Sequence, residues 1–259
     1  MAGLCFRSIF LPARLIFFPL IVTETMYEEQ TYDGYAQAEP VVGIASERRA
    51  QFVTRTYQHL LAAIVGFTAI EVAIFKSGLA LPMAKAMLST SWLLVLGGFM
   101  VAGWLFTGMA ARAKTIGTQY VALAGYVVAE AIIFVPLLVL AEISAPGAIQ
   151  SAALVTLLGF SLLTGIAMMS GKDFTFLGAF LRWLGVGAIL LIVAGVVFGF
   201  QLGTFFSVAM VVFAGATILY STSKVLRTYP EDRYVSAALE LFASVALMFW
   251  YVLRLFSRD

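Results

Sequence analysis

The chain has 259 residues, of which 62% are hydrophobic and 12% are charged, and its formal net charge is +2. Soluble domains are about 45–50% apolar and about 25% charged, so this composition excludes an ordinary water-soluble domain and indicates a membrane protein. The small net charge argues against nucleic-acid binding. A single cysteine, Cys5, and a single histidine, His59, exclude an intrachain disulfide and a His/Cys metal site, so we expect no cofactor and no metal.

Residues 1–45 are predicted to be a polar, disordered N-terminal segment, followed by a membrane domain over residues 46–259. Residues 4–22 are apolar, but Pro12, Arg14 and Pro19 interrupt them and disfavour a spanning helix. Residues 24–47 are acidic and polar, a composition typical of disorder. Met26 is a plausible natural start, so we hypothesise that residues 1–25 are not part of the natural protein. An intact mass beginning at Met1 or Ala2 would refute this hypothesis.

Seven later segments are long and apolar enough to span a bilayer, which takes roughly 20 residues. They lie at about residues 57–75, 91–110, 118–141, 148–169, 176–200, 203–222 and 235–256. Short connections with turn residues, such as Ala145-Pro146-Gly147, separate them. Because backbone donors cannot stay unpaired in hydrocarbon, the sequence predicts an all-α, seven-helix membrane bundle.

The distribution of Lys and Arg predicts that the N-terminus is cytoplasmic. In that orientation, the outer side carries Lys76 and Lys85, joined by Arg254 and Arg258 if the last segment crosses fully. A re-entrant last segment stays open as the alternative. The inner side carries the larger set of Arg48, Arg49, Arg55, Arg112, Lys114, Lys172, Lys224, Arg227 and Arg233.

Four stretches resemble the Bax inhibitor-1 (TMBIM) family. They read FVTRTY at residues 52–57, GKDFTFLG at 171–178, ILYSTSK at 218–224 and AALELFAS at 237–244. The resemblance runs in the family's order over residues 50–259. It implies a bundle whose last helix is central, surrounded by six others.

The resemblance also implies a function. The family is associated with proton-sensitive calcium leak and with suppression of cell death. A bacterial branch looks like a modulator of the FtsH membrane protease, and that branch also ends in Ser-Arg-Asp, as this chain does at residues 257–259. The resemblance therefore favours a bacterial inner (plasma) membrane, and as partners the lipid bilayer with calcium, protons or a membrane protease.

One departure from the family affects its proton sensor. In leak-competent members, an aspartate in the sixth span faces one in the seventh, and the two carboxyls share a proton. Here Ser221 and Ser244 stand at these positions, and their hydroxyls do not titrate. Glu240, one turn before Ser244, could supply a carboxylate near the inner mouth, with Lys224 as its candidate partner. The alternative is that Glu240 is a solvated acid at a helix start.

Other charged residues carry open alternatives. Glu130 lies in the middle of the third span, where a charge costs about 2.5–3.5 kcal/mol, so it is expected to face the bundle interior. It is either a cation or proton ligand, or a protonated acid bonded to a neighbouring helix. Arg112 matches a basic residue proposed to lock the family's aspartate pair, or it anchors the inner leaflet. Glu71 and His59 are expected at the two interfaces of the first span.

Two hypotheses for the function remain. The chain lacks H-E-x-x-H, G-x-S-x-G and P-loop motifs, so we do not expect an enzyme. The first hypothesis is a calcium or proton leak that depends on Glu130 or Glu240. The second is a non-conducting modulator of an FtsH-type membrane protease, with residues 26–47 as the segment that the protease binds.

Overall fold

The computed structural model describes residues 40–43, 46–200 and 202–257. The predicted N-terminal segment therefore lies almost entirely outside the described residues. So do the proposed start at Met26 and the last two residues of the Ser-Arg-Asp ending. The described part forms a compact unit that begins at Pro40.

Seven helices are long and apolar enough to cross a membrane, which confirms the predicted all-α bundle. Two of them extend beyond the predicted spans, since α2 begins at Ser46 and α8 ends at Thr228. Polar residues can continue a helix once it has left the hydrocarbon. The seven are α2 (Ser46–Lys76), α4 (Trp92–Ala111), α5 (Ile116–Ser144), α6 (Ala148–Met169), α7 (Leu177–Phe198), α8 (Thr204–Thr228) and α9 (Tyr234–Phe256).

A shorter helix, α3 (Ala80–Ser89), lies in the connection between the first two spans and was not predicted. Gly78 ends α2 with a φ of +76°, a conformation that favours glycine. Pro82 falls in the first turn of α3, where a proline is tolerated. The helix packs the small residues Ala80 and Ala84 against α5, so this connection is ordered by burial rather than by length.

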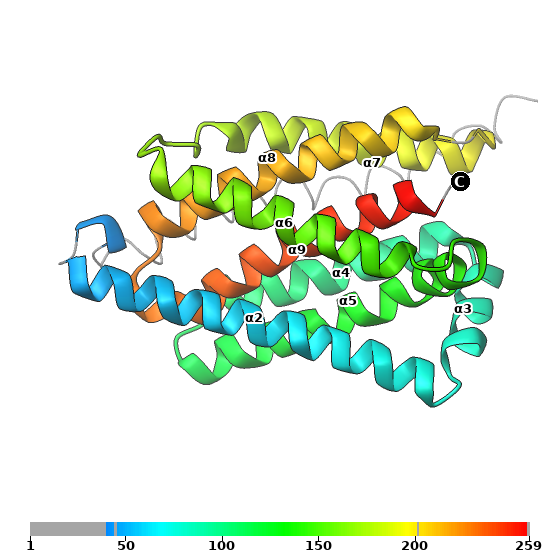
Figure 1. Ribbon diagram of the computed structural model, residues 1–259, viewed down its shortest axis with the longest axis horizontal. Coiled ribbons are helices and arrows are strands. Elements are labelled where there is room, and N and C mark those ends of the chain that lie inside the picture. The colour runs from blue at the N-terminus through cyan, green and yellow to red at the C-terminus, as the bar shows by residue number, and fades with distance from the viewer. Residues whose placement is uncertain (1–39, 44–45, 201, 258–259) are drawn as a thin grey trace, which may run out of the picture. The chain divides into compact units, whose positions relative to one another are not determined.

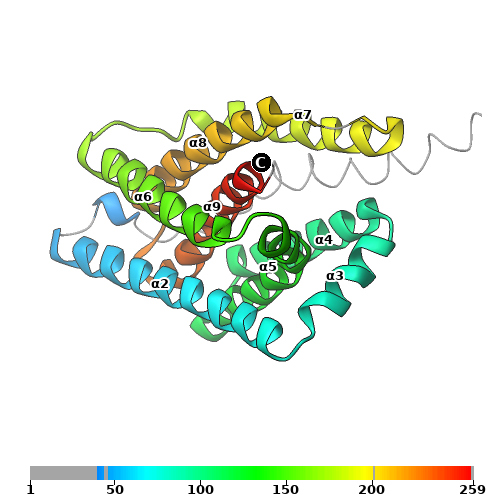
Figure 2. The ribbon, with the colours of Figure 1, turned by 45° about the vertical axis from the view of Figure 1, so that its right-hand side comes forward.

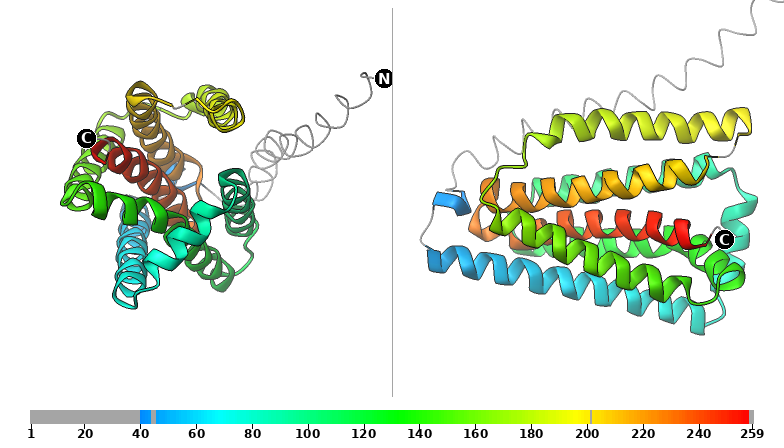
Figure 3. Two further views of the ribbon diagram at one scale, coloured as in Figure 1. Left: turned by 90° about the vertical axis from the view of Figure 1, so that its right-hand side faces the viewer. Right: turned by 45° about the horizontal axis from the view of Figure 1, so that its top comes forward.

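The helices alternate in direction along the bundle (Figure 1). The starts of α2, α5 and α9 lie at one end, together with the short turns η1 (Val41–Gly43) and η2 (Glu231–Arg233). This end is called the η2 end, and the opposite end, which carries α3, is called the α3 end. Helix α9 runs from the η2 end towards the α3 end without a break, which favours a full crossing over a re-entrant segment (Figure 3).

Helix α9 is central, as predicted. It contacts α2, α4, α5, α6 and α8, and it is the most buried of the seven spans. Helix α7 differs from the expected arrangement because it packs mainly against α8 at the edge of the bundle (Figure 2). Lipid supplies no hydrophobic drive for helix association, so a helix that is apolar apart from one residue, Arg182, is stable at such an edge.

The surface of the spans is apolar and the interior holds polar groups. Leu94, Trp183 and Phe205 are 70%, 76% and 93% exposed. Exposed apolar patches of this extent mark a membrane-facing surface. Glu130, in contrast, is buried, which confirms that it turns away from the acyl chains.

Candidate functional site

The two serines at the family's acid positions meet between α8 and α9. Ser221 Oγ and Ser244 Oγ lie 3.0 Å apart, and both side chains are buried. Ser244 Oγ also donates to the carbonyl oxygen of Glu240 at 3.1 Å. A hydroxyl has one proton to donate, so Ser221 is left as the donor in the serine pair. The pair is thus a closed, neutral contact in which both donors are used.

Glu240 lies beside this pair and is not a freely solvated acid. Lys224 Nζ lies 3.3 Å from Glu240 Oε1, and the hydroxyl of Tyr229 donates to Glu240 Oε2 at 2.6 Å. The side chains of Lys224 and Glu240 are 26% and 19% exposed. The structure therefore brings together the two residues that the sequence offered as partners, and adds Tyr229, which sequence reasoning missed.

The predicted lock residue, Arg112, lies elsewhere. It is the exposed C-cap of α4. Lys224, rather than Arg112, is the cation that pairs with Glu240. The reason is helical spacing, because Lys224 lies three residues after Ser221 on α8 and α8 packs directly on α9.

The GKDFTFLG stretch forms the turn between α6 and α7 and is fastened to the end of α8. Asp173 Oδ1 accepts from the backbone N–H of Thr175 at 2.8 Å and lies 3.6 Å from Arg227 Nε. Ser223 Oγ accepts from the N–H of Phe174 at 3.0 Å. The hydrogen bonds from Thr175, and after them the charge of Arg227, lower the pKa of Asp173.

Packing explains the second glycine of that stretch, Gly178. A Cβ at Gly178 would lie 2.7 Å from the ring of Tyr220 on α8. The motif therefore positions α7 and its turn against α8, close to the serine pair but separate from it. Its role is structural support for the residues that follow Tyr220.

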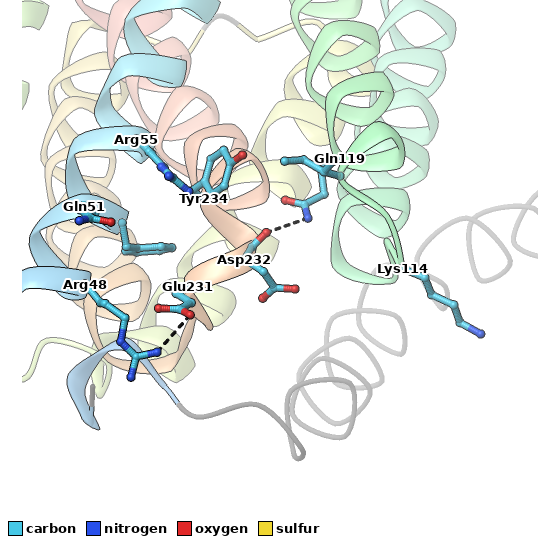
Figure 4. Close-up of a pocket in the computed structure, with 10 residues that line it drawn as sticks. Arg48, Gln51, Arg55, Lys114, Gln119, Glu231, Asp232 and Tyr234 are labelled. Atoms are coloured by element: carbon cyan, nitrogen blue, oxygen red, sulfur yellow. Dashed lines mark hydrogen bonds and ion pairs between the residues drawn. The ribbon is translucent and has the colours of Figure 1, made fainter. Parts of the chain in front are cut away.

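A polar cavity of about 350 Å³ opens at the η2 end, between α2, α5 and η2 (Figure 4). Gln119, buried on α5, donates to the carbonyl of Asp232 at 3.1 Å and accepts from the N–H of Ser236 at 3.2 Å. Arg48 pairs with Glu231 at 3.4 Å, while Lys114 extends away from the other labelled side chains (Figure 4). The cavity is lined by Arg48, Gln51, Phe52, Arg55, Lys114, Ile116, Gln119, Glu231, Asp232 and Tyr234.

Sequence reasoning missed this cavity because its lining comes from three separated stretches. The predicted excess of Lys and Arg on one side was the available signal. His59 lies beside it, half-buried rather than at a free interface. Its Nδ1 is 2.7 Å from the carbonyl of Arg55 and its Nε2 is 2.7 Å from the Tyr120 hydroxyl. A carbonyl only accepts, so Nδ1 carries a proton, and the histidine fastens α2 to α5.

Two acids lie deeper in the bundle. Glu130 on α5 is 5% exposed, and the hydroxyl of Tyr126, one turn earlier, interacts with it. Glu71, near the end of α2, is 6% exposed, so it is buried inside the bundle rather than solvated. Neither carboxyl oxygen of Glu71 has a hydrogen-bond partner among the residues that the structure describes.

Three buried hydroxyls form a further polar group in the bundle. Tyr57, Thr164 and Thr222 bring three hydroxyls from α2, α6 and α8 near one another. The hydroxyl of Tyr57 interacts with those of Thr164 and Thr222. Sequence reasoning did not identify them, because single hydroxyls in an apolar span give little signal. They make the interior between the helices more polar than the helix sequences suggest.

Comparison with known protein families gives a match over most of the chain. The family model described as the inhibitor of apoptosis-promoting Bax1 matches residues 49–259. No curated protein matches the chain. The matched range contains the serine pair, Glu240, Glu130 and Glu71.

Proposed function

The chain is a member of the Bax inhibitor-1 family, and on that premise we propose that it is a slow proton leak in a bacterial inner membrane, with the η2 end in the cytoplasm. The proposal rests on one observation, the burial of Glu130 in the interior of a seven-span bundle. An ionisable residue in such a place is costly, and acids retained there commonly serve ion or proton pathways.

The spacing of the acids favours the proton over calcium. Calcium takes six to eight oxygen ligands, whereas a proton needs one carboxyl oxygen. Glu240 lies near the η2 end of α9, whereas Glu130 lies in the middle of α5. The acids thus sit at separate depths rather than in one coordination shell.

The contacts at the η2 end support a proton pathway whose inner opening, called the mouth, is closed in this structure. The Ser221–Ser244 contact fills the place of the family's titrating pair with a neutral hydrogen bond. Beside it, the carboxylate of Glu240 is held by Lys224 and Tyr229. Opening of the mouth would then depend on separating Lys224 from Glu240, not on a proton shared between two aspartates.

The test is proton flux in liposomes that contain the purified protein and a pH-sensitive dye. We expect Glu130→Gln to lower the flux at least tenfold, because the amide cannot release a proton. Glu142→Gln is the matched control, since Glu142 is an exposed acid on the same helix. Glu240→Gln should also change the flux, because it removes the charge that Lys224 holds. Wild-type flux equal to that of protein-free liposomes would refute the leak.

A second candidate function is favoured by the serine pair itself. A neutral, closed contact at the sensor position suits a protein that does not conduct and instead modulates a membrane-bound FtsH-type protease. Crosslinking and co-purification with such a protease test this function. A protein without flux that captures the protease would support it, whereas flux without capture would remove it.

The orientation has its own test. Single cysteines replacing Lys85 and Lys172, in a background without Cys5, are exposed on opposite ends of the bundle. A membrane-impermeant thiol reagent added to intact cells should label the cysteine at 85 and spare the one at 172. The reverse pattern would place the η2 end outside.

A further inference from the structure

Glu71 is a buried acid without a partner, near the α3 end of α2. Its side chain is 6% exposed, and neither of its carboxyl oxygens is hydrogen-bonded within the described part of the chain. A buried polar group without a hydrogen bond costs free energy, and a buried unpaired charge costs far more. The position therefore strongly favours the neutral, protonated acid.

Glu71 lies between two apolar layers on one face of α2. One turn before it, the ring of Phe67 packs edge-on against Phe134 of α5 at 5.2 Å, and against Phe242 of α9 at 6.2 Å. One turn after it, Phe75 joins the cluster that α3 makes with α5. Residues four apart share a helix face, so Glu71 points into the same interface as the two phenylalanines of its own helix.

Phe67, Phe134 and Phe242 are called the aromatic layer. Helices α2 and α5 are parallel, because His59 contacts Tyr120 and, further along both helices, Phe67 contacts Phe134. Glu130 lies one turn before Phe134, on the η2 side of the layer. Glu71 lies one turn after Phe67, on the α3 side. Each acid lies four residues from the aromatic layer, on opposite sides of it, so the two acids are roughly 12 Å apart along the bundle axis.

The charged residues at the α3 end do not enter this interface. On the elements packed around Glu71 they are Lys76 on α2, Lys85 on α3, Glu142 on α5 and Arg254 on α9. The first three are exposed and Arg254 is half-buried. Glu71 is thus set apart from the surface charges around it.

We propose that Glu71 and Glu130 are an outer and an inner proton-binding site on either side of the aromatic layer, which is the barrier between them. This inference rests on the proposed leak and deepens it. A lone carboxyl among apolar groups can take up and release one proton, whereas it lacks the oxygens that calcium requires. Phe134 is the centre of the barrier, because Phe249 stacks on it at 5.5 Å and Trp250 packs edge-on at 5.0 Å.

Chemical labelling tests the state of Glu71 without measuring transport. Dicyclohexylcarbodiimide is apolar and adds to protonated carboxyls in apolar surroundings, whereas a charged, water-soluble carbodiimide reaches exposed ones. In the full-length protein in liposomes, we expect the apolar reagent to modify Glu71 at least tenfold more than Glu142, as measured by peptide mass spectrometry. Equal labelling of Glu71 by the two reagents would place it in water and overturn the inference.

Flux measurements test the pathway. We expect Glu71→Gln to lower proton flux at least tenfold, like Glu130→Gln, while Glu142→Gln leaves it unchanged. Phe67→Leu should raise flux severalfold, because it thins the aromatic layer while keeping an apolar side chain. Flux from the wild type that is unchanged by Glu71→Gln overturns this inference alone. An absence of wild-type flux overturns both this inference and the leak, and the labelling result then distinguishes a buried acid from an exposed one.

Discussion

The polar groups at the η2 end of α8 and α9 differ from those between α2 and α5. At the η2 end, Ser221, Ser244 and Glu240 all have partners at 2.6–3.3 Å. Between α2 and α5, Glu71 has neither carboxyl oxygen paired within the described residues. The first region matches the family's motifs and is a satisfied, stabilising network. The second carries no motif and keeps costly groups unpaired. In this protein, the residues that resemble the family form the supporting network. The buried groups without partners are the ones whose retention needs a functional reason.

The largest expected effect breaks the packing that surrounds the two buried acids. Phe134→Ala removes a ring that is only 1% exposed, and we expect it to lower the free energy of unfolding by about 3–5 kcal/mol. Val128→Ala, on the lipid-facing side of α5, is the control and should cost less than about 1.5 kcal/mol. Thermal unfolding in detergent, followed by tryptophan fluorescence, measures both. Equal losses would show that the aromatic layer is not a tightly packed core.

A smaller effect is expected from the satisfied network. Glu240→Gln leaves Lys224 without its acid, and a hydrogen bond to a charged group is worth about 1.5–3 kcal/mol. Glu231→Gln, which breaks the exposed pair with Arg48, should cost less than about 1 kcal/mol. Urea unfolding of the two variants compares them. If Lys224→Met in the Glu240→Gln background gives no recovery, the two side chains are not coupled.

The serine pair should contribute still less to the free energy of unfolding, but it can be converted into a pair of carboxyls. Ser221→Ala should cost about 1 kcal/mol, since Ser244 keeps its bond to the Glu240 carbonyl. Replacing both serines by aspartate places two carboxyls within reach of one shared proton, which should make liposome flux steeply pH-dependent. Flux from the double variant that does not vary with pH would show that the position alone does not create the sensor.

The smallest effect concerns the exposed turn between α6 and α7. The pKa of Asp173 is lowered from 3.8 in the folded protein. Its carboxylate therefore contributes fully to the free energy of unfolding above pH 3.8, and this contribution is lost as the pH falls through the lower pKa of the folded state. Because the side chain is half exposed, the effect should be below about 1 kcal/mol. The protection of the Thr175 amide against hydrogen exchange, taken relative to its intrinsic rate at each pH, should fall on acidification. Asp173→Asn should show the lower protection at neutral pH.

Much of the fold followed from the sequence because the bilayer restricts the choices. Long apolar runs must be helices, and the spans and the central last helix are confirmed. Helix α3 was missed because Pro82 indicates a turn, although a proline is also accepted in the first turn of a helix. The edge position of α7 could not be inferred, since that helix is apolar apart from Arg182 and no side strongly favours a neighbour.

The candidate site was predictable only where spacing along one helix fixed it. Ser221, Lys224 and Glu240 lie as their positions on α8 and α9 suggested. The burial of Glu71 was not foreseen, because it results from the packing of α3 and α5 around α2 and not from any pattern in α2 itself. The polar cavity at the η2 end depends on three loops and helix starts meeting in space, which no local pattern records.

Tyr229 joins two parts of the molecule that the sequence keeps far apart. Its carbonyl accepts from the backbone N–H of Val41 at 2.9 Å, while its hydroxyl holds Glu240. The turn η1 is therefore connected, through Tyr229, to the carboxylate of Glu240. A displacement of η1 would pull on the residue that holds this carboxylate, so the position of the turn and the hold on Glu240 are mechanically linked.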